Sequence, residues 1–106
     1  MSINHEVMKV KLYRAMSQME LEQLLLTGEF AAGPNSLEVK FFAERFEDAV
    51  KWGDLLLGKG NYRMVEINIS SQVADSFLCW EKLDGIGPAR CAELEQLKDF
   101  TVRIIL

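Results

Sequence analysis

The sequence contains few of the residues that build metal sites and disulfide frameworks. In 106 residues it has two cysteines, Cys79 and Cys91, and one histidine, His5. The cysteines form no CxxC pair, and a zinc site of the Cys/His type cannot be assembled from them, so we expect no bound metal. A disulfide between the two stays open as an alternative, but we expect two buried thiols in a reducing compartment.

Long apolar runs and an excess of basic residues are also missing. No run approaches the roughly 20 apolar residues that a membrane-spanning helix needs, and no basic segment followed by an apolar one marks a signal peptide. Sixteen acidic residues against twelve basic ones give a formal charge of −4. This balance argues against nucleic acid or an anionic membrane as partner and suits a basic protein. We expect a cytoplasmic protein.

The composition that is present is typical of one small globular domain over residues 1–106. With 49% hydrophobic and 26% charged residues, the chain can bury a single core. Alternating and helical apolar periods follow one another along the chain, which predicts an α+β fold. We expect a mixed, mainly antiparallel sheet of about four or five strands, with about three or four helices. The predicted strands are residues 7–14, 39–43, 62–69 and 101–106.

The segment from Lys40 to Gly53 is expected to organise the fold. Val39–Ala43 is a run of β-formers, and from Phe46 the apolar residues recur at the spacing of one helix face as far as Leu57, where Gly58 should end the helix. Glu44 and Arg45 lie at the corner between this strand and this helix, where we expect their side chains to project into a cleft.

Three further helices are predicted from local signals. Ser17 with Glu20 forms a capping box before a helix that should end at Gly28, with a loop over residues 28–38. Ser70 or Ser71 can cap a short helix, and residues 79–83 either extend it or form a strand. After a loop at residues 84–88, the spacing of apolar residues predicts a helix over 89–97.

Parts of the chain resemble the ADP-ribosyltransferases. Residues 12–17 are similar to the first-strand motif of that family, and Phe41–Ala49 is similar to its strand-to-helix segment. Glu93 and Glu95 have the Glu-x-Glu spacing of its late acidic motif. The resemblance implies a related fold and NAD as cofactor, with Arg14 gripping the phosphates and Glu93 or Glu95 as catalytic carboxylate. The family's Ser-Thr-Ser serines are absent, and Ala15 stands where the family has glycine.

A wider resemblance concerns small domains of bacterial polymorphic-toxin and contact-dependent inhibition loci. It is carried by Leu12, Phe42, Trp52 and the stretch 84–90. A free-standing acidic chain in that setting implies the immunity partner, a non-catalytic protein that binds a basic toxin domain without cofactor and occludes its active site. An active NAD-dependent mono-ADP-ribosyltransferase is the alternative. The residues expected to contact the toxin are Glu44, Arg45, Glu47, Asp48, Trp52 and Asp54.

Residues 83–94 also resemble a helix-hairpin-helix motif. In that motif Gly-hydrophobic-Gly lets backbone amides approach a DNA phosphate, which here implies Gly85 and Gly87 with Arg90 nearby. Acidic neighbours outnumber basic ones around this segment. DNA-backbone binding is therefore the third interpretation, behind the protein-binding and transferase ones.

Overall fold

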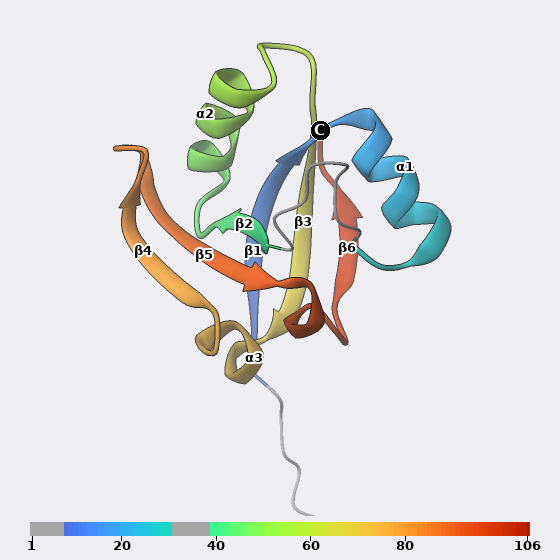
Figure 1. Cartoon of the computed structure of the whole chain (residues 1–106), viewed down its shortest axis with the longest axis vertical. Helices are drawn as coiled ribbons and strands as arrows, with labels where there is room; N and C mark the ends of the chain where they lie inside the picture. The colour runs from blue at the N-terminus through green and yellow to red at the C-terminus, as the bar shows by residue number, and fades with distance from the viewer. Residues whose placement is uncertain (1–7, 31–38) are drawn as a thin grey trace, which may run out of the picture.

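A computed structural model of the chain describes residues 8–30 and 39–106, and these form an open six-stranded sheet with three α-helices (Figure 1). Every strand pairing is antiparallel, and the order across the sheet is β4-β5-β2-β1-β3-β6. The strands are β1 Lys9–Met16, β2 Val39–Ala43, β3 Arg63–Ser70, β4 Leu78–Leu83, β5 Gly87–Glu93 and β6 Thr101–Ile104. The helices are α1 Gln18–Thr27, α2 Phe46–Leu56 and α3 Ser71–Asp75, with a 3-10 turn, η1, at Leu94–Gln96.

The α+β class is confirmed, but the sheet is larger than predicted and no parallel pair occurs among the described residues. Of the two alternatives for residues 79–83, the strand is confirmed as β4. The strand that was not predicted is β5, and the prediction of a helix over residues 89–97 is wrong. Asp84 and Gly85 both have positive φ, at 55° and 72°. Ile86 N–H donates to the Leu83 carbonyl at 3.0 Å, closing a tight hairpin turn of the kind that Asp-Gly favours. The hairpin directs residues 87–93 back along β4 as a strand.

The helix termini follow the predicted capping signals. Ser17 Oγ accepts the backbone N–H of Glu20 at 3.1 Å, and Gly28 ends α1 in the left-handed conformation with φ 75°. Ser70 Oγ accepts the N–H of Val73 at 3.2 Å and begins α3. The predicted loop over 28–38 lies largely outside the described residues, since 31–38 are not described.

The two longer helices cover opposite faces of the sheet. On one face, Leu21 and Leu24 of α1 pack against buried side chains of β1, β2 and β3. On the other face, Ala49 and Trp52 of α2 pack against a second cluster that includes Met64. Because neighbouring strand residues point to opposite faces, Val65 belongs to the first cluster and Met64 to the second.

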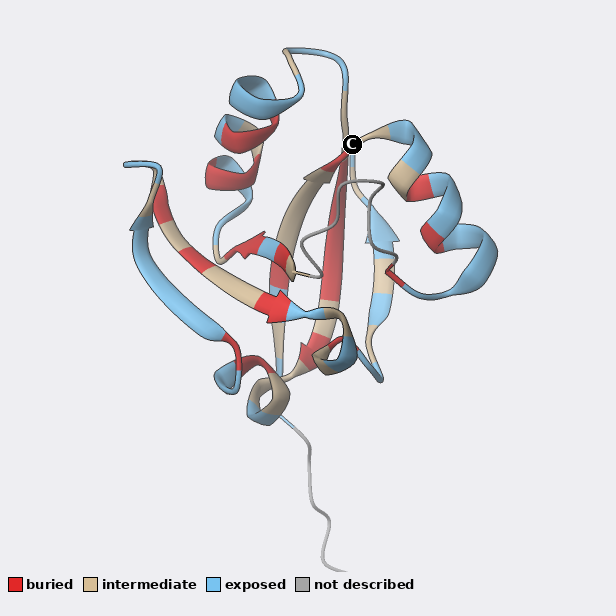
Figure 2. Ribbon diagram, in the orientation of Figure 1, coloured by how far each residue is buried: buried red, intermediate tan, exposed pale blue. Residues whose placement is uncertain are grey.

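Burial is uneven across the sheet (Figure 2). The central strand β3 is buried over most of its length, whereas every residue of the edge strand β4 except the half-buried Leu83 is exposed. Within the described part of the chain, no helix is long and apolar enough to span a membrane.

Candidate functional site

Of two hollows among the described residues, the larger lies where the ends of α1, α2 and the β4–β5 turn approach β1. Its volume is about 430 Å³. Apolar side chains line most of it, contributed chiefly by Trp52 and Leu56 of α2, by Leu57 directly after that helix and by Leu83 of β4. Arg14 and Glu20 line it as well, so an apolar hollow is in contact with an ion pair.

The ion pair belongs to a cluster of three charged residues from three elements. Arg14 at the end of β1 donates from Nε to Glu20 Oε2 at 2.8 Å and from Nη2 to Glu20 Oε1 at 3.0 Å. Lys40 of β2 places its Nζ 3.6 Å from the same Oε2. The side chains are 19%, 20% and 9% exposed for Arg14, Glu20 and Lys40. Two cations therefore share one carboxylate in a mostly buried position.

The pKa values of this cluster reflect both burial and charge. Burial acts to raise the pKa of Glu20, but the hydrogen bonds and charge of Arg14, together with Lys40, outweigh it and hold the pKa below its ordinary value of 4.5. For Lys40, burial is the main cause that lowers the pKa of the ammonium group; Arg14 adds to it and Glu20 opposes it. Glu20 thus accepts two hydrogen bonds from Arg14 and lies at ion-pair distance from Lys40.

Arg14 also bridges two strands that separate at this end of the sheet. Tyr13 and Ala43 form the single register pair between β1 and β2. Beyond that pair, Arg14 Nη1 donates to the Phe41 carbonyl at 2.9 Å, in place of a backbone bond between the strands. The guanidinium is thereby fixed on both sides, by the carboxylate of α1 and by the backbone of β2.

Two buried polar atoms on α2 have no hydrogen-bond partner among the described residues: Asp48 Oδ2 and Trp52 Nε1. The two residues are one helical turn apart and are 3% and 8% exposed. Asp48 Oδ2 packs directly against Gly87 of β5, where a Cβ atom would overlap it. Glycine at this position is what allows the Asp48 carboxylate to lie inside the protein.

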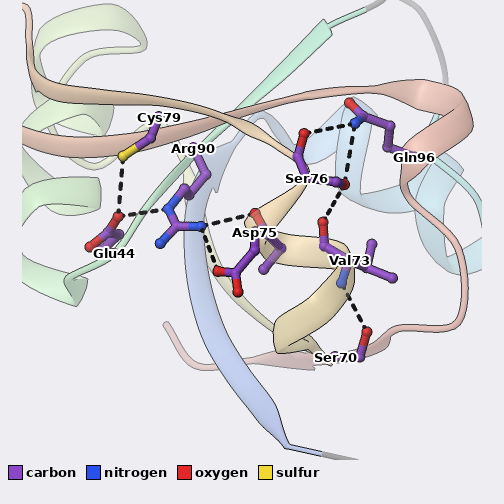
Figure 3. A network of polar contacts seen from close by, with 9 residues as sticks. Glu44, Ser70, Val73, Asp75, Ser76, Cys79, Arg90 and Gln96 are labelled. Carbon is purple, nitrogen blue, oxygen red and sulfur yellow. Dashed lines mark hydrogen bonds and ion pairs between the residues drawn. The ribbon is translucent and has the colours of Figure 1, made fainter.

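A second polar network lies on the α1 side of the sheet (Figure 3). Arg90 of β5 donates from Nε to Glu44 Oε2 at 2.7 Å and from Nη1 to the Ala74 carbonyl at 2.9 Å, with Asp75 Oδ1 3.6 Å away. The Cys79 thiol lies 3.9 Å from the same Glu44 oxygen. Cys79 is exposed and Cys91 half-buried, so the expectation of two buried thiols is wrong. The bond to Glu44 raises the pKa of Arg90 above its ordinary value. The network ties the β2–α2 corner to α3 through β5.

The residues implied by the transferase resemblance do not come together. Arg14 lines the larger hollow, whereas Glu93 and Glu95 line a second hollow of about 410 Å³. Glu93 ends β5 and its side chain caps η1, and Glu95 lies in that turn. Both residues were expected in one helix over residues 89–97, but Glu93 belongs to a strand and Glu95 to a three-residue 3-10 helix.

The residues expected to contact a toxin separate into two groups. Asp48 and Trp52 are buried in the packing of α2, so neither can form an open binding surface. Arg45, Glu47 and Asp54 are exposed. Asp54 accepts the hydroxyl of Tyr62 at 2.7 Å.

The predicted corner lines neither of these two hollows. Glu44 is half-buried and bonded to Arg90, and Arg45 is exposed.

The proposed DNA-binding hairpin is a different structure from the motif it resembles. Gly85 lies in the β4–β5 turn and Gly87 begins β5, so no helix N-terminus follows them. Arg90 is held by Glu44 and Ala74. The amides that the motif would offer to a phosphate are part of a β-hairpin.

Sequence reasoning missed Lys40 and the role of Glu20. Glu20 was identified only as a capping residue, yet its carboxylate turns to Arg14. Lys40 interrupts a run of β-formers. This charge within an otherwise apolar strand was the signal that could have marked Lys40 as part of an ion pair. Among the described residues, no group of three or more histidine, cysteine, aspartate and glutamate side chains is placed to hold a metal.

No protein-family model, curated protein or solved structure matches this chain.

Proposed function

We propose that this chain is a non-catalytic protein-binding module, of the immunity type, which neutralises a bacterial toxin by covering its active site. The observation that carries this proposal is the edge strand β4. Leu78 and Trp80 on this strand are 60% and 48% exposed. The strand is bonded only to β5 among the described residues, so the backbone of its other edge is unpaired.

An open edge with large apolar side chains is a feature that proteins normally protect, because it pairs readily with other chains. The charged residues of β4, Glu81 and Lys82, lie in its second half, so its first half from Leu78 to Trp80 carries no charge to block such pairing. A partner that covers β4 would bury these side chains and satisfy the free backbone groups, which is the arrangement of strand addition.

The apolar surface continues from β4 across the neighbouring strands. Leu78 pairs with Cys91 of β5, and Cys91 pairs with Phe41 of β2, so the three side chains share a row on the same face. Phe41 is 39% exposed and Cys91 is half-buried. The row gives a partner an apolar contact wider than one strand.

Carboxylates surround this surface and set the charge of the partner. Asp75, Glu81 and Asp84 are exposed before, on and after β4, against one exposed lysine, Lys82. The excess of negative charge favours a basic partner and speeds its approach. The active sites of toxins that act on nucleic acids are basic, which suits occlusion by this edge.

The arrangement of Arg14 supports the non-catalytic interpretation over the transferase one. Its guanidinium is bonded to Glu20 and to the Phe41 carbonyl, and the candidate catalytic carboxylates line another hollow. A ligand phosphate would have to compete with Glu20 for this side chain.

The test uses the full chain, immobilised, to capture a partner from extracts of the cells that encode it. The captured protein is then purified, and its toxic activity is measured with and without the chain. We expect Leu78→Asp to weaken the complex at least tenfold and to abolish the protection. Leu26→Asp is the matched control, because Leu26 is 85% exposed on α1, away from β4.

Two results would overturn the proposal. One is equal protection by Leu78→Asp and by Leu26→Asp. The other is calorimetric binding of NAD that is lost in Arg14→Ala, which would favour the transferase.

A further inference from the structure

We propose that the larger hollow is a binding site for a small apolar amine, with its hydrocarbon body against the end of α2 and its ammonium group beside Asp84. The inference does not depend on the proposed function, which uses the free edge of β4 from Leu78 to Trp80. None of those three edge residues lines the hollow. The inference rests on the shape of the hollow, on its charge and on the aromatic rings in its lining.

The shape suits a small ligand. A hollow of about 430 Å³ falls in the usual range for ligand sites, which are lined mainly by apolar side chains with a few polar groups that fix orientation. Leu56 ends α2 and Leu57 follows it, and their side chains are 68% and 37% exposed although both line the hollow. A ligand with an apolar body would remove this exposed apolar area from water, which favours binding.

The charge of the lining favours a cation. Its charged residues are Arg14, Glu20 and Asp84. Arg14 and Glu20 are bonded to each other, so together they contribute no net charge. The Asp84 carboxylate is exposed and has no ion pair or hydrogen bond within the described part of the chain. The lining therefore carries one negative charge that no described residue of the protein pairs.

The β4–β5 turn holds this carboxylate in place. Asp84 and Gly85 both have positive φ, and Gly85 N–H donates to the Lys82 carbonyl at 3.1 Å within the turn. Asparagine adopts positive φ as readily as aspartate, and Asn-Gly favours the same kind of turn. Asp84→Asn should therefore remove the charge and leave the hairpin unchanged.

Aromatic rings add to the preference for a cation. Tyr13, Phe41 and Trp52 all line the hollow. The faces of aromatic rings attract organic cations, and tryptophan attracts them most strongly. Because Asp84 is exposed, an ammonium group beside it keeps part of its hydration while the hydrocarbon body enters the hollow.

The experiment follows the emission of Trp52 in a Trp80→Phe background, because the chain has two tryptophans. Adamantylammonium is titrated, with adamantanol and adamantanecarboxylate as neutral and anionic probes that share the same rigid apolar body. We expect saturable binding of adamantylammonium, with adamantanol about threefold weaker and adamantanecarboxylate about tenfold weaker. A factor of about three is the size expected of an ion pair at an exposed carboxylate.

The charge is tested with Asp84→Asn, which should weaken adamantylammonium about threefold and leave adamantanol unchanged. Asp99→Asn is the matched control and should change neither affinity. Asp99 is also exposed, has the same φ of 55° and does not line the hollow.

The apolar contact is tested with Leu56→Ala, which should weaken adamantylammonium and adamantanol alike, by at least about threefold. Leu55→Ala is the matched control, because Leu55 is 63% exposed on the same helix and lies outside the lining. It should leave both affinities unchanged. Both leucines are largely exposed, so neither substitution should prevent folding.

Absence of a saturable change with adamantylammonium would overturn the inference, as would an affinity for adamantanol or adamantanecarboxylate that equals or exceeds it. Equal effects of Asp84→Asn and Asp99→Asn, or of Leu56→Ala and Leu55→Ala, would also overturn it. These titrations use the chain without a protein partner and leave the test of β4 unaffected, so the two proposals fail separately.

Discussion

Glu20→Gln should be among the most destabilising conservative substitutions in α1. The substitution keeps the size of the side chain and one carbonyl oxygen, but it removes the charge that Arg14 and Lys40 share. Arg14 would lose one of its two hydrogen bonds to this side chain, those at 2.8 Å and 3.0 Å, and two cations would face each other without a carboxylate.

The magnitude follows from the burial of the three groups. A hydrogen bond to a charged partner contributes about 1.5–3 kcal/mol, and removing one partner of a fully buried pair costs about 3–5 kcal/mol. Since Glu20 is 20% exposed, water compensates part of this loss. We expect the free energy of unfolding to fall by about 2–4 kcal/mol, which corresponds to a Tm lower by roughly 8–16 °C for a domain of this size.

The assay is urea and thermal unfolding followed by circular dichroism. Glu22→Gln is the matched control: Glu22 is exposed on the same helix and accepts one bond, from Gln18 at 3.3 Å, so its loss should cost less than about 0.5 kcal/mol. Lys40→Met added to Glu20→Gln should recover part of the loss, because it removes one of the two facing cations.

The dependence on pH gives a second readout. The folded protein holds the pKa of Glu20 below 4.5, so the carboxylate contributes stability above that pH, and the contribution is lost as the pH falls through the lowered pKa. The difference between the wild type and Glu20→Gln should therefore be full at pH 6 and shrink steadily below about pH 4.5. A loss no larger than that of Glu22→Gln, or a difference independent of pH, would refute the structural role assigned to the cluster.

Three further outcomes are expected. Gly87→Ala should lower the free energy of unfolding, measured in urea, by about 1–3 kcal/mol, because the added Cβ overlaps Asp48 Oδ2. The loss should be smaller in an Asp48→Ala background, and an equal loss in both backgrounds would contradict this packing. Cys79 should react with iodoacetamide at pH 8 several-fold faster than Cys91, because Cys79 is exposed while burial, aided by Glu93, raises the pKa of the Cys91 thiol. Mass spectrometry of the peptides measures the two rates, and preferential labelling of Cys91 would be the contrary result. Asp54→Asn should lower the pKa of Tyr62, because the hydrogen bond from the Tyr62 hydroxyl to Asp54 is the main cause that raises this pKa above 10. The measurement is phenolate absorbance, which should appear at lower pH in the variant, and an unchanged titration would contradict this cause.

Local signals were sufficient where neighbours in the sequence are also neighbours in space. Ser17 and Gly28 fixed the two ends of α1 through a hydroxyl cap and a left-handed glycine, and both act within one turn of the helix. The strand Val39–Ala43 and the helix that follows from Phe46 were predicted with the boundaries that the structure shows, apart from one residue at the helix end. The α+β class followed from these elements.

Local signals failed where two structures fit the same pattern. The spacing of Cys91, Leu94 and Leu97 is compatible with a helix, and the segment was predicted as one. The segment forms a strand instead, because Asp84-Gly85 makes a hairpin turn and β5 then pairs with both β2 and β4. A strand bonded on two sides pairs its backbone N–H and C=O groups along its length, whereas a short helix leaves such groups unpaired at both ends.

The sequence by itself determined most of the elements outside β5, most of their limits and the acidic balance of the chain, since these depend on residue type and short spacing. Only the tertiary structure decided which charges meet. Arg14, Glu20 and Lys40 come from β1, α1 and β2, and Asp48 turns inward because β5 supplies a glycine opposite it. Such contacts depend on how strands are ordered in the sheet, and that order is set by the packing of the whole core rather than by any one segment.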